Sequence, residues 1–447
     1  MNSSLSNLID HVLLRLSQVQ KNLGMTLLGP LNDSTPFKEI LDSMAMVEFL
    51  AIMAEDCAVD IAAIEDSVQK KFTNVGELAA CMLAAGLLPK SSNERVSETH
   101  SSNSPFDFQP SPLEIGQVMD GANYGWLAAT SVRLPDMAQS ADSVNGILGR
   151  PKGWLERHAG IRSRRLWHTQ DPVSAAVEAA RECLERASVE PDEVGELFIT
   201  SEAPPQLAGL GALLHHELQL RPEAGSLEIG GACTGFLAAL HMAQAMLPKI
   251  HTGLIVTVEA PSQYLVLEPG EAGEAAALFG DAAAACLISA NPSQANSTPL
   301  SEVILGVDGS GHGLIQIHRG PSGWIHLQMN GKKLAARAIQ AMAKAGTKLM
   351  AQYRLNYDDL QAVVAHGGNG RMPPLLARRL GFPPEQVWSE TATTGNLGSA
   401  SLPVGWHAHQ PAPKGPILWT AVGAGLTWGS VLSGFQVQTH LPPGSPL

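Results

Sequence analysis

Cys233 stands in a turn of small residues that leads from a short extended stretch into a long apolar helix. Glycine at positions 230, 231 and 235 leaves room for an acyl chain to approach the sulfur. The dipole of the helix that Cys233 opens favours the thiolate, which is the nucleophilic form of a cysteine. A buried structural cysteine is the commoner role for this residue type, but the small-residue turn favours a nucleophile here.

A cysteine nucleophile needs nitrogen-bearing partners that the fold brings close to it. His366 follows the apolar stretch 362–365 and precedes two glycines, so its imidazole should lie at the carboxyl end of a strand. Asn396 stands in another turn of small residues, and its amide could donate to a thioester carbonyl or an enolate oxygen. Either residue alone is more often structural, but three such turns in this order predict an acyl-transfer site.

Ser43 follows Asp42 at the start of a predicted helix, and a plain helix cap is the ordinary role for such a serine. The charge and helical pattern of the surrounding segment indicate a second role. Residues 1–90 hold 11 acidic and 6 basic side chains, and no strand pattern is visible among them. Helical apolar spacing covers Leu5–Val19, Ser43–Glu55 and Asn74–Leu87.

This acidic helical segment resembles an acyl carrier protein, a small four-helix domain in which the serine of an Asp-Ser-Leu or Asp-Ser-Met motif takes phosphopantetheine. The resemblance implies that Ser43 carries 4'-phosphopantetheine, attached by a phosphopantetheinyl transferase. A serine at a helix N-terminus suits this attachment, because the helix dipole favours the phosphate anion. Residues 89–115 follow and are polar and rich in serine and proline, which predicts a flexible linker.

From about residue 120 onward, strand and helix patterns alternate, which predicts an α/β fold of layered sheets. The strand candidates are Tyr124–Val132, Glu196–Thr200, Gly253–Val258, Ala283–Ser289, Ala362–Ala365 and Ile417–Ala421, and the helix candidates are Pro172–Ala187, Thr234–Leu247, Gly331–Leu355 and Leu375–Leu380.

Composition narrows the class of protein. The 447 residues are 45% hydrophobic and 16% charged, which is typical of globular domains. A net charge of −13 argues against general affinity for nucleic acid or anionic membranes. We expect no signal peptide and no membrane helix. The five cysteines form no CxxC pair, so neither zinc nor a disulfide framework is indicated, and we expect a cytoplasmic protein without a metal.

Residues from about 124 to 437 resemble 3-oxoacyl-acyl carrier protein synthase III and its thiolase-fold relatives. The shared motifs are Trp154-Leu-Glu-Arg-His-Ala-Gly-Ile-Arg-Ser-Arg-Arg, the Cys233 turn, Leu278-Phe-Gly-Asp-Ala-Ala-Ala-Ala, Met329-Asn-Gly-Lys, the His366 and Asn396 turns, and Val422-Gly-Ala-Gly-Leu-Thr-Trp-Gly-Ser. The resemblance implies a homodimer of five-layered αβαβα subunits.

By the same resemblance, Cys233 is acylated, and His366 and Asn396 polarise a malonyl thioester and drive its decarboxylation. The backbone N–H groups of Cys233 and Ala424 would form the oxyanion hole. The family's aromatic contact for pantetheine or coenzyme A corresponds to Trp154, but His158 stands where the family has an arginine. A donor bound to a carrier protein therefore becomes an alternative to coenzyme A.

Glu202 falls where a relative, hydroxymethylglutaryl-CoA synthase, has its catalytic glutamate. A carboxylate there could take a proton from an α-carbon or a hydroxyl, whereas a solvated loop glutamate is an equally open interpretation. If Glu202 lines the site, the reaction could be a non-decarboxylative condensation, or acyl transfer to an alcohol or amine.

The predicted organisation is a carrier-like domain at 1–88, a linker at 89–115 and a thiolase-fold enzyme at 116–447. The leading hypothesis is an acyl-transferring condensing enzyme of fatty-acid, polyketide or related specialised metabolism, with thioester substrates on a carrier protein or coenzyme A. The alternative enzymatic activity is a non-decarboxylative condensation, or acyl transfer to an alcohol or amine, by the same cysteine. A carrier or docking scaffold without catalysis is the alternative of another class.

Overall fold

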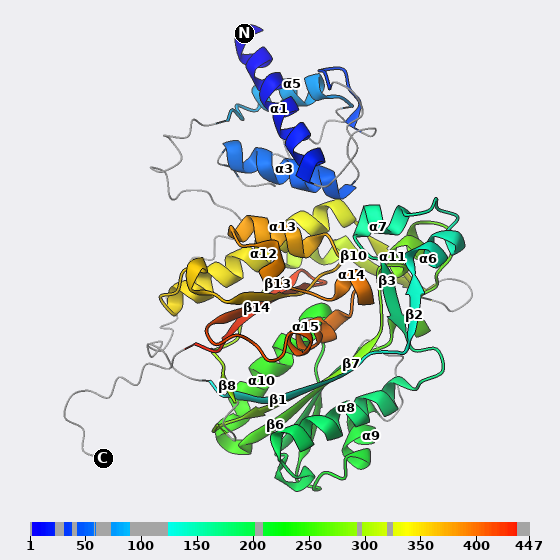
Figure 1. The fold of residues 1–447 in the computed structure, drawn as a ribbon, viewed down its shortest axis with the longest axis vertical. Coiled ribbons are helices and arrows are strands. Elements are labelled where there is room, and N and C mark those ends of the chain that lie inside the picture. Colours follow the sequence, from blue (N-terminus) through cyan, green and yellow to red (C-terminus); the bar gives the residue numbers. More distant parts are fainter. Residues whose placement is uncertain are drawn as a thin grey trace, which may run out of the picture. The chain divides into compact units, whose positions relative to one another are not determined.

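The computed structural model describes residues 2–22, 31–37, 43–57, 59, 73–89, 124–201, 209–292, 297–319 and 325–435 (Figure 1). The chain divides into two compact units. The first comprises residues 1–111 with 330–337, and the second comprises residues 112–329 with 338–447.

The described part of residues 2–89 is helical. It contains α1 (Asn2–Asn22), α3 (Ser43–Cys57) and α5 (Val75–Ala84), so the three predicted helices are confirmed. Asn74 caps α5, because its side chain accepts a hydrogen bond from the Glu77 backbone N–H at 3.0 Å. The predicted four-helix count is tested only in part, since residues 58 and 60–72 lie outside the described residues.

Apolar side chains from all three helices form one core in this segment. Val12, Phe49 and Leu78 are fully buried in it. Helices α1 and α3 also share a partly buried ion pair, in which Arg15 donates two hydrogen bonds to the Asp56 carboxylate at 2.6 and 2.8 Å. The bundle therefore has both an apolar core and a specific polar contact between α1 and α3.

Two sheets form the second unit. The first has the strand order β5-β4-β6-β7-β1-β8, and the second has the order β13-β12-β14-β15-β9. In each sheet, neighbouring parallel strands carry the segments of the site: β4 pairs with β5 and β6, and β12 pairs with β13 and β14. The bounds are β1 (Trp126–Arg133), β4 (Glu196–Ser201), β5 (Gly225–Glu228), β6 (Thr252–Glu259), β7 (Ala282–Ser289), β8 (Thr298–Pro299), β9 (Ile304–Val307), β12 (Ala362–Ala365), β13 (Val387–Trp388), β14 (Ile417–Gly423) and β15 (Thr427–Ser433).

Helices separate and cover these sheets, as Figure 1 shows. Helices α10 (Gly235–Ile250) and α15 (Ser401–Ala408) lie between the sheets, where Phe236 and Trp406 pack with Trp419 of β14. Helices α8 (Pro172–Ala187) and α9 (Gly209–Glu217) cover the outer face of the first sheet. Residues 338–352 of α12 (Gly331–Gln352) and all of α13 (Met372–Leu380) lie against the second. The layers alternate as αβαβα, as predicted.

Two small hairpin-like sheets and short helices complete the unit. They are β2 (Met137–Ser140) with β3 (Ser163–Leu166), β10 (Ile315–Arg319) with β11 (Ile325–Met329), α6 (Ala141–Ile147), α7 (Trp154–Ala159), α11 (Glu271–Ala276) and α14 (Thr391–Thr394). Every helix within the described ranges is too short or too polar to cross a membrane.

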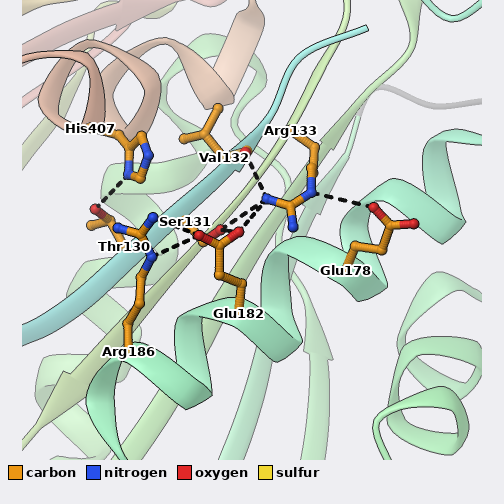
Figure 2. A network of polar contacts seen from close by, with 8 residues as sticks. All are labelled: Thr130, Ser131, Val132, Arg133, Glu178, Glu182, Arg186 and His407. Carbon is orange, nitrogen blue, oxygen red and sulfur yellow. Dashed lines mark hydrogen bonds and ion pairs between the residues drawn. The ribbon is translucent and has the colours of Figure 1, made fainter.

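A polar network joins β1 to α8 (Figure 2). The Glu182 carboxylate accepts hydrogen bonds from Arg133, from Ser131 at 2.9 Å and from Arg186 at 2.8 Å. Arg133 also reaches Glu178 at 3.3 Å. This network connects β1 of the first sheet with the helix that covers it.

Candidate acyl-transfer site

Cys233 lies in a single 3-10 turn, Ala232–Thr234, and α10 begins two residues later at Gly235. The 3-10 turn leads directly into α10, so Cys233 lies in the first turn of a continuous helical segment, as predicted, although α10 itself begins at Gly235. The backbone just before Cys233 is unusual: Gly231 has a φ of 136° and Ala232 a φ of 48°. A positive φ at alanine is strained, and such strain is typical of functional turns.

Gly235, two residues after Cys233, lies in close packing with neighbouring segments. A Cβ atom on Gly235 would lie 3.2 Å from Thr200 Cβ and 3.4 Å from Ser399 Cβ. Glycine at 235 thus lets the Cys233 turn pack against the turn Gly398–Ala400, which follows Asn396.

The end of β14 also lies against this turn. A Cβ on Gly423 would lie 3.0 Å from Gly231 O and 3.2 Å from Cys233 N. The hydroxyls of Thr234 and Thr427 are 2.7 Å apart and also join the two segments. Ala424 directly follows Gly423, so the two predicted oxyanion-hole residues lie on neighbouring segments.

His366 directly follows β12 and is buried, with 3% of its surface exposed. Its backbone N–H donates to Thr420 O of β14 at 3.0 Å, which continues the parallel ladder through His366. Its Nδ1 lies 3.1 Å from the Ser401 hydroxyl oxygen. Burial lowers the pKa of His366 from 6.5 to about 4, so the ring is neutral near neutral pH.

Asn396 is equally buried, and both its backbone and its side chain are fixed. Its N–H donates to Leu278 O at 2.7 Å, and its carbonyl accepts from Gly280 N at 3.0 Å. The side-chain Oδ1 accepts from Gly398 N at 3.0 Å. This contact assigns the oxygen of the amide and leaves the NH₂ group as its donor side.

Sequence reasoning missed Glu259, the last residue of β6, which is 1% exposed. Its Oε1 accepts from the backbone N–H of Ser399 at 3.0 Å and from the Ser399 hydroxyl. The Ser399 hydroxyl also lies 2.8 Å from Thr200 Oγ1. Glu259 therefore anchors the turn between Asn396 and Ser401. An acid at the end of the apolar run 252–260 is the signal that could have revealed it.

Trp154 begins α7 and has two close side-chain neighbours. The imidazole of His158 stacks on it with ring centroids 4.9 Å apart. The Arg150 guanidinium carbon lies 5.4 Å from the ring centroid, and Arg150 is paired with Glu274. Arg150 therefore supplies a cation beside Trp154 from a different sequence position than the one predicted.

The structure gathers the segments of four predicted site residues, Cys233, His366, Asn396 and Ala424. Ser43 is the first residue of α3 in the other unit. Glu202 lies outside the described residues, and β4 ends directly before it at Ser201. In the part of the chain that the structure describes, no group of three or more His, Cys, Asp or Glu side chains is arranged to hold a metal ion.

Two family models match the segments that form this site. Residues 227–309 match 3-oxoacyl-[acyl-carrier-protein] synthase III, and residues 350–435 match the C-terminal part of the same family. A 3-oxopimeloyl-[acyl-carrier-protein] synthase of Rhodothermus marinus is 30% identical over 337 residues, which make up 72% of this chain and 96% of that relative. The chain belongs to the 3-oxoacyl-[acyl-carrier-protein] synthase III family.

Other relatives agree with this assignment to the synthase III family. The β-ketoacyl-[acyl-carrier-protein] synthase III of Aquifex aeolicus is 26% identical over 313 residues, covering 68% of this chain and 98% of that protein. A crystal structure of the Aquifex aeolicus enzyme superposes with a TM-score of 0.63 over 70% of this chain and 100% of its own, at 25% identity. Xanthomonas campestris OleA has the same fold, with a TM-score of 0.64 over 72% of this chain and 99% of its own, at 19% identity.

The protein is thus an acyl-transferring condensing enzyme, as predicted, with a thiolase-like α/β fold. The interpretation as a scaffold without catalysis is not supported by these relatives, which are named as synthases.

Proposed function

We propose that this synthase III takes an acyl group on Cys233 and joins it to a carrier-bound malonyl unit by decarboxylative Claisen condensation. One observation carries the proposal: the Cys233 turn packs against the turn that follows Asn396 and against the Gly423 end of β14. His366 is connected to the same region through Ser401. The nucleophile follows β5, the imidazole follows β12, and the amide donor lies in the turn between α14 and α15.

In the first step, Cys233 Sγ forms a bond to the carbonyl carbon of the donor thioester, and the donor thiol leaves. The backbone N–H groups of Cys233 and Ala424 stabilise the oxyanion. In the second step, the malonyl thioester loses carbon dioxide while Asn396 and His366 stabilise its carbonyl oxygen. The resulting enolate carbon attacks the Cys233 thioester, releases the thiol and yields a 3-oxoacyl thioester.

The proposed donor is bound to a carrier protein rather than to coenzyme A. His158 and Arg150 both contact the Trp154 ring, and Arg150 is also paired with Glu274. A nucleotide base that stacked on Trp154 would compete with these contacts. This geometry supports delivery of the acyl group by a protein whose recognition does not depend on an adenine.

We also propose that residues 1–88 are a fused carrier domain and that residues 89–115 are its tether. Ser43 begins a helix of 15 residues, so a phosphate ester at this residue would lie at the positive end of the helix dipole. That position fits 4'-phosphopantetheine, which a phosphopantetheinyl transferase would attach. When bound, the group supplies a thiol that holds an acyl or malonyl chain as a thioester.

The remaining proposals concern assembly and compartment. The enzyme unit would form a homodimer, as the resemblance implies, and the protein would act in the cytoplasm within fatty-acid or related specialised metabolism. None of the five cysteines, all of which lie in the described ranges, forms a disulfide. Cys233 is among these free cysteines, as the proposed nucleophile must be.

A product assay distinguishes the proposal from acyl transfer. The full-length protein is incubated with an acyl thioester and a malonyl-carrier, and carbon dioxide and product are quantified. The proposal expects equal amounts of carbon dioxide and 3-oxoacyl product, both lost in Cys233→Ala. An ester or amide product without carbon dioxide would contradict it and would favour acyl transfer, with Glu202 as the candidate base. Asn396→Asp is expected to shift the products toward that chemistry.

A further inference from the structure

Glu259, at the end of β6, directs its buried carboxylate at the turn Gly398–Ala400. One carboxylate oxygen, Oε1, accepts the backbone N–H of Ser399 at 3.0 Å and also accepts the Ser399 hydroxyl. A Cβ atom on Gly398 would lie 2.9 Å from the Glu259 carboxyl carbon and 3.0 Å from each carboxylate oxygen. The carboxylate therefore packs directly against Gly398 and holds the next residue by two donors.

The residue that this carboxylate packs against also orients the side chain of Asn396. The Gly398 N–H donates to Asn396 Oδ1 at 3.0 Å, and a backbone N–H can only donate, so the contact selects the oxygen end of the amide. The last torsion of an asparagine side chain has only a broad preference of its own. The Gly398 N–H therefore determines on which side the Asn396 NH₂ group lies.

The backbone of Asn396 is held by a different segment. Its N–H donates to Leu278 O at 2.7 Å, and its carbonyl accepts from Gly280 N at 3.0 Å. Loss of the Glu259 carboxylate would thus release the turn at Gly398 while the Asn396 backbone keeps these bonds. The amide could then rotate and present its oxygen where the NH₂ group is needed.

We propose that Glu259 is a positioning residue for the condensation step, which keeps the Asn396 NH₂ group toward the malonyl thioester carbonyl through Gly398. This inference rests on the proposed function. When the bond from the malonyl α-carbon to its carboxylate breaks, carbon dioxide leaves and the electron pair forms the enolate. The enolate oxygen accepts from the Asn396 NH₂ group. Glu259 itself touches neither the substrate nor the reacting atoms.

The proposal predicts a defect that is confined to one of the two half-reactions. In the proposed mechanism, acylation of Cys233 uses the backbone N–H groups of Cys233 and Ala424 as its oxyanion donors. Decarboxylation uses the Asn396 amide. A variant of Glu259 should therefore slow decarboxylation more than it slows acyl loading.

The ratio of the two rates tests this in the full-length protein. Acyl loading of Cys233 is measured with the N-acetylcysteamine thioester, from a panel of acetyl to decanoyl, that loads wild-type protein fastest. Decarboxylation is measured as carbon dioxide released from a malonyl-carrier. In Glu259→Ala, the ratio of decarboxylation to loading should fall at least about 10-fold, because outright loss of one oxyanion donor costs about 100-fold or more. Partial unfolding would lower both rates equally and leave the ratio unchanged.

Two variants on β6 serve as controls. Glu259→Gln keeps a carbonyl oxygen that can accept from Ser399, so it should recover most of the ratio. Thr257→Val removes a buried hydroxyl that lies 3.4 Å from Ala284 O within the first sheet, and it should show the wild-type ratio. If Glu259→Ala does not fold, Ser399→Ala removes the hydroxyl donor to Oε1 and should lower the same ratio.

A double-mutant cycle shows whether Glu259 acts through Asn396. In an Asn396→Ala background, adding Glu259→Ala should leave the residual decarboxylation unchanged, because the group that Glu259 positions is already gone. An equal fall in both backgrounds would overturn the proposal. So would a wild-type ratio in Glu259→Ala, or in Ser399→Ala where that variant replaces it. The proposed function fails in a different way, through wild-type protein that carries an acyl group on Cys233 and releases no carbon dioxide.

Discussion

Residue-scale chemistry depends on His366, whose surroundings keep it uncharged. It is buried behind β12 and β14, and its pKa of about 4 lies well below 6.5. The unfolded chain therefore binds a proton at this residue between these two values, and the folded chain does not. The stability that neutral His366 allows is fully present above about pH 6.5 and declines as the pH falls toward 4.

This difference predicts the pH dependence of stability. Between about pH 7 and pH 5, His366 should lower the free energy of unfolding by about 2 kcal/mol, since one pKa unit corresponds to about 1.4 kcal/mol. The variant His366→Gln should lack this contribution and show a shallower slope. Tryptophan fluorescence during denaturant unfolding measures it in the enzyme unit alone, because all eight tryptophans lie beyond residue 125. Equal slopes in both proteins would contradict the account of His366.

Gly423 gives a second prediction at this scale. In Gly423→Ala, the new Cβ would press on Cys233 N and Gly231 O at 3.2 and 3.0 Å and displace the proposed oxyanion hole. Acylation of Cys233 should slow about 100-fold, as for loss of one oxyanion donor. Stopped-flow or quenched-flow acyl loading measures it. Gly313→Ala is the control, since its Cβ would meet nothing within 4 Å. Acyl loading of Gly423→Ala at the wild-type rate would show that the close contact between Gly423 and the Cys233 turn does not shape the oxyanion hole.

At the scale of elements, the first sheet depends on the attachment of α8 to β1 through the network of Figure 2. Burial raises the pKa of Glu182, but hydrogen bonds from Arg133, Arg186 and Ser131 outweigh it and lower the pKa to about 2. Because the folded value lies below 4.5, this contribution to stability is present above about pH 4.5 and is lost as the pH falls toward 2.

The variant Glu182→Gln should lower the free energy of unfolding by about 1 kcal/mol at neutral pH. The expected loss of stability is small because the Glu182 side chain is 27% exposed and solvent screens its ion pairs. Glu185→Gln, on the exposed face of the same helix, should leave the stability unchanged. Thermal midpoints of both variants, compared at about pH 7 and pH 3, measure this. A Glu182→Gln deficit as large at about pH 3 as at about pH 7 would exclude the ionic explanation.

Elements with a strong local pattern were predictable from the sequence. The run 253–258 is mostly apolar because both faces of β6 are buried, and α8 matches its predicted bounds. The strand β15 was not predicted, because Thr427–Ser433 contains glycine and two serines that interrupt its apolar pattern. The helix α15 was missed because proline and glycine interrupt its short run.

The same contrast applies to the site. Cys233, His366 and Asn396 were predictable because each lies in a turn of small residues with a distinctive composition. Glu259 and Ser401 were not, because their roles come from contacts with segments distant in the sequence, 140 residues apart for Glu259 and Ser399 and 35 for Ser401 and His366. The positive φ values at Gly231 and Ala232, directly before Cys233, were not revealed by composition.

At the scale of the whole molecule, the proposed carrier and enzyme share one chain. A flexible tether between them would hold a Ser43-bound thioester near Cys233 at an effective concentration of about a millimolar. Such delivery within one molecule, or across a dimer, would be insensitive to the bulk concentration of carrier. It would also explain why a strong coenzyme A contact around Trp154 is not needed.

Modification by a phosphopantetheinyl transferase tests this arrangement. Intact-protein mass spectrometry of the full chain should show the addition of one arm, and the arm should be absent from Ser43→Ala. Ser34→Ala, an exposed serine of the same unit, should be modified normally. Loading of Cys233 from a small acyl thioester should be unchanged in both variants. Modification that survives in Ser43→Ala would contradict the assignment of the carrier serine.

The acyl-enzyme itself tests the central claim most directly. Full-length protein is loaded with an acyl thioester, the acylated peptide is located by mass spectrometry, and a malonyl-carrier is then added. The account predicts one acyl group on Cys233, discharged with an equal amount of carbon dioxide as the 3-oxoacyl product appears. An acyl group found elsewhere, discharge without carbon dioxide, or full turnover by Cys233→Ala would contradict it.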